Sequence, residues 1–184
     1  MGKRIGKSPS YRLDSDELAS LIEIGTSRNK GFHERGQDGL HEGGPTALFR
    51  DINSAIGEFV VHKLTGLVWA ARYIDIYGDD VANLEVKASE HYKGDLIFRR
   101  IERYSDDHIF VLVTGDYRKK GHQGLIYTMA GWGTVALAKE KGYKKSYQDN
   151  GEERGSPQTV LPYPYQFRMT SFPYELKDAL PKEW

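Results

Sequence analysis

The residues with the clearest capacity for chemistry lie in the segment DVANLEVK, at positions 80–87. If the segment is a β-strand, its side chains alternate between two faces. One face then carries Ala82, Leu84 and Val86, and the other carries Asn83, Glu85 and Lys87. Glu85 and Lys87 can therefore address one point in space, and Asp80 at the entrance of the strand supplies a second carboxylate. Paired carboxylates suit a hard divalent cation such as Mg²⁺ or Mn²⁺.

A divalent cation beside a lysine is what hydrolysis of a phosphodiester bond requires. The metal neutralises charge on the scissile phosphate and acidifies a bound water, and a neighbouring cation orients that water. Asp80 and Glu85 would hold the metal, and Lys87 would position the attacking water.

The spacing Asp80, Glu85-x-Lys87 resembles the Asp…(Asp/Glu)-x-Lys signature of the PD-(D/E)XK, or restriction-endonuclease-like, nucleases. The resemblance implies that Asp80 and Glu85 are metal ligands and that Lys87 is the catalytic lysine. It also implies a further metal ligand at Glu58, because many members add a glutamate from the preceding helix. The proline of the family motif is absent here, and the gap between Asp80 and Glu85 is short. Asp75 is therefore an alternative to Asp80 as the first ligand.

The resemblance covers roughly residues 50–135. It continues downstream through the segments GDLI (94–97), SDD (105–107), FVLV (110–113) and GW (131–132), which are similar to uncharacterised phage-type members of the superfamily. These likenesses imply a Mg²⁺-dependent endonuclease of phage type that hydrolyses DNA.

Charge is unevenly distributed, although 26 basic and 26 acidic residues cancel over the whole chain. Residues 51–90 hold seven acids and three bases, whereas residues 91–145 hold eleven bases and six acids. An acidic centre beside a basic surface suits a metal-dependent nuclease, with DNA as the partner. The candidates for contact with nucleic acid are Lys93, Arg99, Arg100, Lys119 and Lys120.

Hydrophobic periodicity and turn residues predict an α/β fold with a mixed central sheet of about four or five strands flanked by helices. Predicted helices cover residues 15–28, 52–64 and 131–141, the first with an N-terminal capping box at Asp14 and Glu17. Predicted strands cover residues 67–76, 81–88, 96–101, 109–114 and 125–127, with turns at 77–80 and 104–107. Residues 29–45 and 146–158 are predicted loops, and the aromatic tail 161–184 is expected to pack on the core. The 184 residues form one domain, with an N-terminal elaboration (1–46), a core (47–145) and a loop with the tail (146–184).

Composition excludes several classes of protein. The chain has no cysteine, which removes disulfide frameworks, thiol nucleophiles and cysteine-ligated zinc. No apolar run is long enough to span a bilayer and the start does not resemble a secretory signal, so we expect a soluble, cytoplasmic protein, in the host cell if phage-encoded. Homo-oligomers are compatible with the sequence.

Two other functions fit the same residues. The first is a nucleic-acid-binding module of the same fold without catalytic turnover. The second is a structural or assembly protein, in which 51–90 is a solvated acidic face and the aromatic tail is an oligomer contact.

Overall fold

Helices and two β-sheets build the fold. The computed structural model describes residues 8–34, 45–69, 81, 84–91, 93–149, 152–167 and 171–173. Along the chain the elements are β1 (Ser10–Arg12), α1 (Ser15–Glu34), α2 (Pro45–Thr65), β2 (Leu84–Ser89), β3 (Leu96–Phe98), η2 (Ile101–Arg103), β4 (Ile109–Thr114), η3 (Gly121–Leu125), β5 (Ile126–Thr134), α3 (Val135–Lys141), β6 (Tyr143–Asp149), β7 (Glu152–Leu161) and η4 (Tyr163–Tyr165). The elements labelled η are short 3-10 helices.

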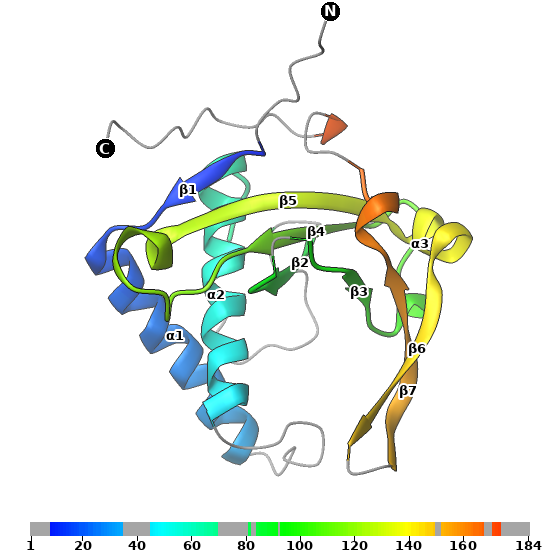
Figure 1. The fold of residues 1–184 in the computed structure, drawn as a ribbon, viewed down its shortest axis with the longest axis horizontal. Helices are drawn as coiled ribbons and strands as arrows, with labels where there is room; N and C mark the ends of the chain where they lie inside the picture. Colours follow the sequence, from blue (N-terminus) through cyan, green and yellow to red (C-terminus); the bar gives the residue numbers. More distant parts are fainter. Residues whose placement is uncertain are drawn as a thin grey trace, which may run out of the picture.

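Within the described residues, the strands form a four-stranded mixed sheet of order β1-β5-β4-β2 and a three-stranded sheet of order β3-β7-β6. Strands β2 and β4 are parallel, and the remaining pairs are antiparallel. Helices α1 and α2 pack on one face of the four-stranded sheet, whereas β3, β7 and α3 pack on its other face (Figure 1). The predicted α/β class with a mixed central sheet is confirmed.

Helix α1 begins at the predicted capping box. The backbone N–H of Glu17 donates to Oδ1 of Asp14 at 2.8 Å, and the backbone N–H of Asp14 donates to Oε2 of Glu17 at 3.1 Å. The helix continues to Glu34, so the loop predicted from residue 29 was wrong for residues 29–34. Contacts with α2 explain the extension, since Asn29 donates to Asp51 at 2.8 Å. Residues 35–44 lie outside the described residues.

Helix α2 confirms the second predicted helix and begins earlier, at Pro45, a residue favoured in the first turn. It ends where Gly66 takes a positive φ of 75°, which glycine adopts without steric cost. Its apolar stripe, including Ile56, Val60 and Leu64, is fully buried against α1 and the sheet.

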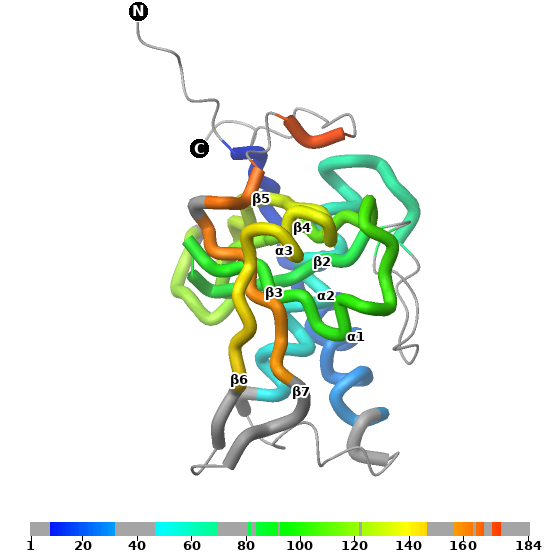
Figure 2. Tube along the Cα trace, turned by 90° about the vertical axis from the view of Figure 1, so that its right-hand side faces the viewer, coloured from blue at the N-terminus to red at the C-terminus, as the bar shows by residue number. Residues whose placement is uncertain are grey.

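A long β-hairpin replaces the loop predicted over 146–158. Strands β6 and β7 pair from Tyr143 opposite Val160 to Asp149 opposite Glu152, and the connecting dipeptide in the sequence is Asn-Gly. Asn-Gly is the strongest short-range signal for a two-residue hairpin, so the sequence contained the evidence. Figure 2 shows β6 and β7 side by side, running away from α3.

Strand β5 is longer than the predicted 125–127 and takes the first residues of the helix predicted at 131–141. Helix α3 starts only after Thr134, whose hydroxyl accepts a hydrogen bond from the N–H of Leu137 at 3.2 Å. Glycine at position 133 lets β5 pass close to the end of β7, because a Cβ there would lie 2.7 Å from the Leu161 side chain.

Two further predicted regions are only partly described. In the predicted strand 67–76, residues 67–69 form no regular strand, although Trp69 makes an isolated bridge with Val81, and residues 70–80 lie outside the description. In the tail, Phe172 is buried against Trp132, with ring centroids 5.8 Å apart, which agrees with packing on the core. No helix among the described residues is long and apolar enough to cross a bilayer.

The crossing of α1 over α2 depends on Gly25, where a Cβ would lie 2.4 Å from Cα of Ile52. Helix propensity alone would make Gly25→Ala stabilising by about 1 kcal/mol. Because the backbone of Ile52 cannot yield easily, we expect the variant to lose about 1–3 kcal/mol of unfolding free energy instead. Urea denaturation measures the difference. Ser20→Ala on the exposed side of α1 is the control and should change stability by less than about 0.5 kcal/mol. A stabilised Gly25→Ala protein would contradict the close crossing.

Candidate functional site

Strand β2 separates apolar from charged side chains as predicted. Leu84 and Val86 are buried in the cluster formed with α2. Glu85 and Lys87 point to the opposite face, where they stand in register with Phe110 and Leu112 of β4. Since Phe110 and Leu112 belong to the second hydrophobic cluster, the Glu85 carboxylate borders the interior between the two sheets.

Glu85 is only 8% exposed, and both of its carboxylate oxygens accept hydrogen bonds. The ammonium of Lys87 donates to Oε2 at 2.7 Å, and the hydroxyl of Tyr104 donates to Oε1, also at 2.7 Å. The Lys87 ammonium also lies 5.6 Å from the centroid of the Phe110 ring. The side chain of Lys87 is 30% exposed, so it connects the buried carboxylate with solvent.

The surroundings keep Glu85 ionised. Burial is the largest single influence and raises the pKa of its carboxyl, but the charge of Lys87 and the hydrogen bonds from Lys87 and Tyr104 together outweigh it. A smaller contribution comes from His108, and the pKa of Glu85 lies below its ordinary value. The site therefore presents a buried anion at neutral pH, which is the state that a metal ligand requires.

Tyr104 was not among the predicted site residues. It follows η2, and its ring packs 4.6 Å from that of His108 and 5.2 Å from that of Phe110, measured between centroids. The turn that carries it is closed by the N–H of His108 donating to the carbonyl of Ser105 at 3.1 Å, as predicted for 104–107. No sequence spacing links a tyrosine in this turn to a glutamate nineteen residues earlier.

The chain just before β2 folds tightly. Val81 and Leu84 exchange two backbone hydrogen bonds, of 3.2 and 2.9 Å, and Val81 also bridges to Trp69. Val81 is fully buried beside Leu84 in the cluster below α2. Asp80 and its alternative Asp75, the predicted first ligands, lie outside the described residues.

Glu58 is not brought to Glu85. It lies on α2, and the adjacent Gly57 faces Val86 and Ala88, on the side of the sheet opposite Glu85. Glu58 is buried, with Arg28 of α1 donating to both carboxylate oxygens at 2.6 and 2.7 Å and the indole N–H of Trp69 donating at 2.9 Å. The described contacts make Glu58 the centre of a buried ion pair between α1 and α2.

The five predicted basic residues are all exposed but occupy two separate places. Arg99 and Arg100 follow β3 and precede η2, beside the turn that brings Tyr104 to Glu85. Lys93, Lys119 and Lys120 follow the carboxyl ends of β2 and β4. Because Glu85 is the second residue of β2, only the two arginines lie at its end of the strands.

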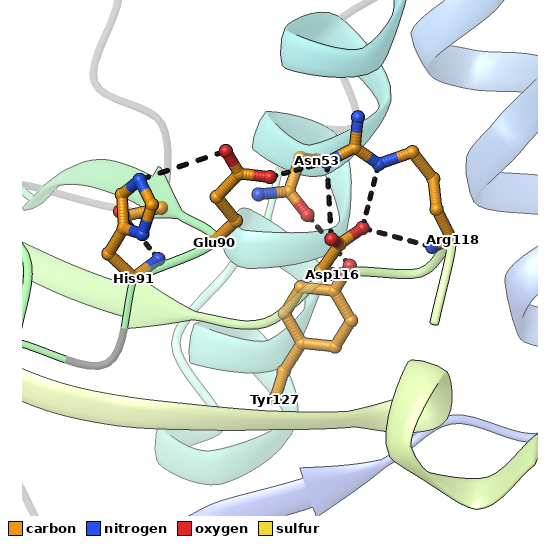
Figure 3. Close-up of polar contacts among 7 residues, drawn as sticks. Asn53, Glu90, His91, Asp116, Arg118 and Tyr127 are labelled. Atoms are coloured by element: carbon orange, nitrogen blue, oxygen red, sulfur yellow. Dashed lines mark hydrogen bonds and ion pairs between the residues drawn. The ribbon is translucent and has the colours of Figure 1, made fainter. Parts of the chain in front are cut away.

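A second polar cluster closes the carboxyl ends of β2 and β4 (Figure 3). Asp116 is buried and accepts hydrogen bonds from the backbone N–H of Arg118 at 3.0 Å and from its guanidinium at 2.9 and 3.1 Å. Arg118 also contacts Glu90 and stacks on Phe49, 3.6 Å from the ring centroid. The hydrogen bond from the Arg118 side chain lowers the pKa of Asp116, despite the opposing effect of burial. Arg118 thus compensates both acids, and the cluster fixes these strand ends to α2.

The described residues contain no group of three or more histidine, aspartate or glutamate side chains able to hold a metal ion. Glu85 is therefore the one predicted ligand that the described structure places with Lys87. No family model matches the chain, and comparisons with curated proteins and with solved structures return no match.

Tyr104→Phe tests the environment of Glu85 while keeping the ring. Losing a hydrogen bond to a buried carboxylate should lower the free energy of unfolding by about 1.5–2 kcal/mol at pH 7. The pKa of Glu85 is lower in the folded state than in the unfolded state, so its ionised form stabilises the fold at pH values above the unfolded pKa, near 4.5. This contribution disappears as the pH falls through the folded pKa. The loss caused by Tyr104→Phe should therefore shrink at pH 3. Urea denaturation at both pH values measures it.

A double-mutant cycle provides the control for this prediction. In a Glu85→Gln background the partner carboxylate is gone, so Tyr104→Phe should cost clearly less at pH 7 than it does in the wild type. Equal losses in both backgrounds and at both pH values would show that Tyr104 contributes through packing alone.

Proposed function

We propose that the protein is a Mg²⁺-dependent nuclease that hydrolyses DNA phosphodiester bonds, with Glu85 and Lys87 at its active site. The observation that carries the proposal is an ionised carboxylate and an ammonium 2.7 Å apart on one face of β2. The partly exposed Lys87 can reach a bound phosphate, while the buried Glu85 is held in one orientation. The mixed sheet with α2 before the motif strand is compatible with the restriction-endonuclease-like core implied by the sequence.

The ligand set we propose is Glu85 with Asp80, or with Asp75 in its place. Val81 pairs with Leu84, and Asp80 and Glu85 are their immediate neighbours in the sequence. Glu58 is left out of the set, because α2 holds it on the other side of the sheet, where it pairs with Arg28.

The chemistry of the donors fits a hard cation, since carboxylate oxygens are the ligands that Mg²⁺ and Mn²⁺ prefer. When bound, the metal would supply charge neutralisation at the phosphate and a more acidic water. The chain's own residues do the remaining work. Tyr104 orients Glu85 through Oε1, and Lys87 offers a positive charge to the phosphate oxygens as negative charge develops on them.

One observation favours a second candidate, a nucleic-acid-binding module without turnover. Both oxygens of Glu85 already accept hydrogen bonds, so the pair with Lys87 can also serve as a buried structural ion pair. In that case the protein would bind DNA but leave it intact with any divalent metal. Cleavage separates the two candidates.

The test incubates purified protein with plasmid, linear and single-stranded DNA in Mg²⁺, Mn²⁺ or EDTA. We expect the wild type to cleave DNA only with metal, and Glu85→Ala to be inactive. Lys87→Ala should cleave at least about 100-fold more slowly while still binding DNA, because its charge acts mainly in the transition state. Lys87→Arg keeps the charge but changes its reach, so weak activity should survive.

Lys30→Ala, which removes an exposed lysine of α1, is the matched control and should cleave like the wild type. If the wild type cleaves DNA and Lys87→Ala does so equally fast, the catalytic assignment is wrong. A wild type that binds DNA but never cleaves it supports the binding module instead.

The two groups of basic residues should contribute unequally to DNA binding. We compare Arg99→Gln/Arg100→Gln with Lys119→Gln/Lys120→Gln, each measured by fluorescence anisotropy in EDTA at several salt concentrations. The arginine pair lies at the Glu85 end of the strands, so its loss should reduce the slope of log Kd against log salt by about 2. The lysine pair should change the slope by less than half as much. A larger effect at the lysines would place the DNA path at the other end of the sheet.

A further inference from the structure

Exposed aromatic rings gather around the beginning of β6 and the segment after β7. Among the described residues the exposed large apolar side chains are Val68 (76%), Tyr143 (47%), Tyr165 (54%) and Phe167 (40%). Tyr143 stands opposite Val160 in the sheet, and η4, which contains Tyr165, starts two residues after β7 ends. Three of the four therefore belong to one region of the molecule.

These rings are held in place although they are exposed. Phe167 lies 4.7 Å from Trp132 between ring centroids and exchanges two backbone hydrogen bonds with it, at 3.2 and 2.8 Å. Tyr165 is in η4, and its backbone N–H donates to the carbonyl of Pro162 at 2.9 Å. Tyr143 is fixed by the pairing of β6 with β7. Rings fixed at the surface in this way offer faces on which planar groups of a partner can stack.

Lysines flank the rings. Lys141 ends α3, and Lys144 and Lys145 follow Tyr143 in β6. The ammonium of Lys144 donates to the buried Thr159 at 2.8 Å, so Lys144 lies on the face that Thr159 occupies, and Tyr143 and Lys145 point to the opposite, outer face. Lys141 forms an ion pair with Glu140 at 2.7 Å. Tyr165 follows β7, and β7 contacts the end of α3, where a Cβ on Gly142 would lie 2.9 Å from the carbonyl oxygen of Val160.

A further positive residue, Arg99, lies across the three-stranded sheet from Lys145. Thr159 of β7 pairs with Lys144 on one side and with Phe98 on the other. The next residues outward, Lys145 and Gln158, are also paired, and Arg99 directly follows Phe98. Adjacent strands are about 4.8 Å apart, so Lys145 and Arg99 lie on the order of 10 Å from each other across β7. Figure 2 shows this sheet from the side of β6 and β7.

We propose that this face, formed by Lys141, Tyr143, Lys145 and Tyr165 and continued by Arg99, binds single-stranded nucleic acid. Unpaired bases stack on the tyrosine rings, and the lysines and Arg99 contact the phosphates. A duplex would bind less well, because its bases are already stacked on each other. The rings are interleaved with charges rather than forming a continuous apolar patch, which favours nucleic acid over an apolar protein partner.

The proposal deepens the proposed nuclease by naming the form of nucleic acid that reaches it. It depends on residues other than Glu85, so binding can be tested without cleavage. Tyr143 and Lys145 lie at the base of the hairpin, so the strand of nucleic acid is expected to run across this base toward Arg99.

The experiment measures binding of fluorescein-labelled dT20, U20 and a matched 20-base-pair duplex by anisotropy in EDTA. We expect the wild type to bind dT20 or U20 more tightly than the duplex, and Tyr143→Ala to weaken single-strand binding about 10-fold. Tyr143→Phe keeps the ring and should stay within about 2-fold of the wild type. Tyr165→Ala should behave like Tyr143→Ala, and Lys145→Gln should reduce the salt dependence. Binding of dT20 alone identifies DNA as the ligand, and binding of U20 alone identifies RNA.

Val68→Ala, which truncates an exposed apolar side chain distant in sequence from this face, is the control and should leave binding unchanged. Thermal melts check that every variant folds. If Tyr143→Ala does not fold, Tyr165→Ala still tests the role of the rings. The proposal is overturned if the wild type binds neither single strand at low salt, or if Tyr143→Ala and Tyr165→Ala bind like the wild type. If Tyr143→Ala lost single-strand binding and duplex binding to the same extent, the proposal would also be overturned. Binding is measured in EDTA, where metal-dependent cleavage does not occur, so its outcome is separate from whether the wild type cleaves DNA.

Discussion

The parallel pairing of β2 with β4 is the constraint on which the rest of the structure depends. It buries Leu84 and Val86 against α2 and sends Glu85 to the opposite face, beside Phe110. Glu85 is buried on that face, where water solvates it poorly, so its charge requires compensation from neighbouring side chains. Lys87 supplies it from the same strand and Tyr104 from the turn before β4. The position of η2 and its turn is thus tied to the charge on one side chain.

Buried carboxylates lie on both sides of the same sheet, and their charges are compensated by different partners. Glu58 accepts a bidentate pair from Arg28, a planar and permanently charged group, and is closed off by Trp69. Glu85 is paired with a flexible lysine that reaches solvent. A guanidinium fork holds its carboxylate in fixed geometry, whereas an ammonium on a four-carbon stem can move to another anion. This contrast supports a structural role for Glu58 and a chemical one for Glu85.

The sequence predicted what depends on local pattern. The capping box of Asp14 places the start of α1, and alternation separates Leu84 from Glu85. The extent of α1 and β5 was missed because contacts between distant segments decide it. The hairpin of β6 and β7 was missed although its Asn-Gly turn is visible in the sequence, because polar strands lack an apolar alternation. Tyr104 reaches Glu85 only through the tertiary fold, which no spacing rule encodes.

Energetics bear on why an ion pair stands at this position. A buried ion pair seldom stabilises a protein more than well-packed apolar side chains of the same size, because removing both charges from water costs as much as their attraction returns. The neighbours of Glu85 and Lys87 in register, Phe110 and Leu112, are apolar and could pack against such a replacement. Stability alone therefore gives little reason to keep the pair. A requirement for charge does, and the phosphodiester hydrolysis that we propose would supply that requirement.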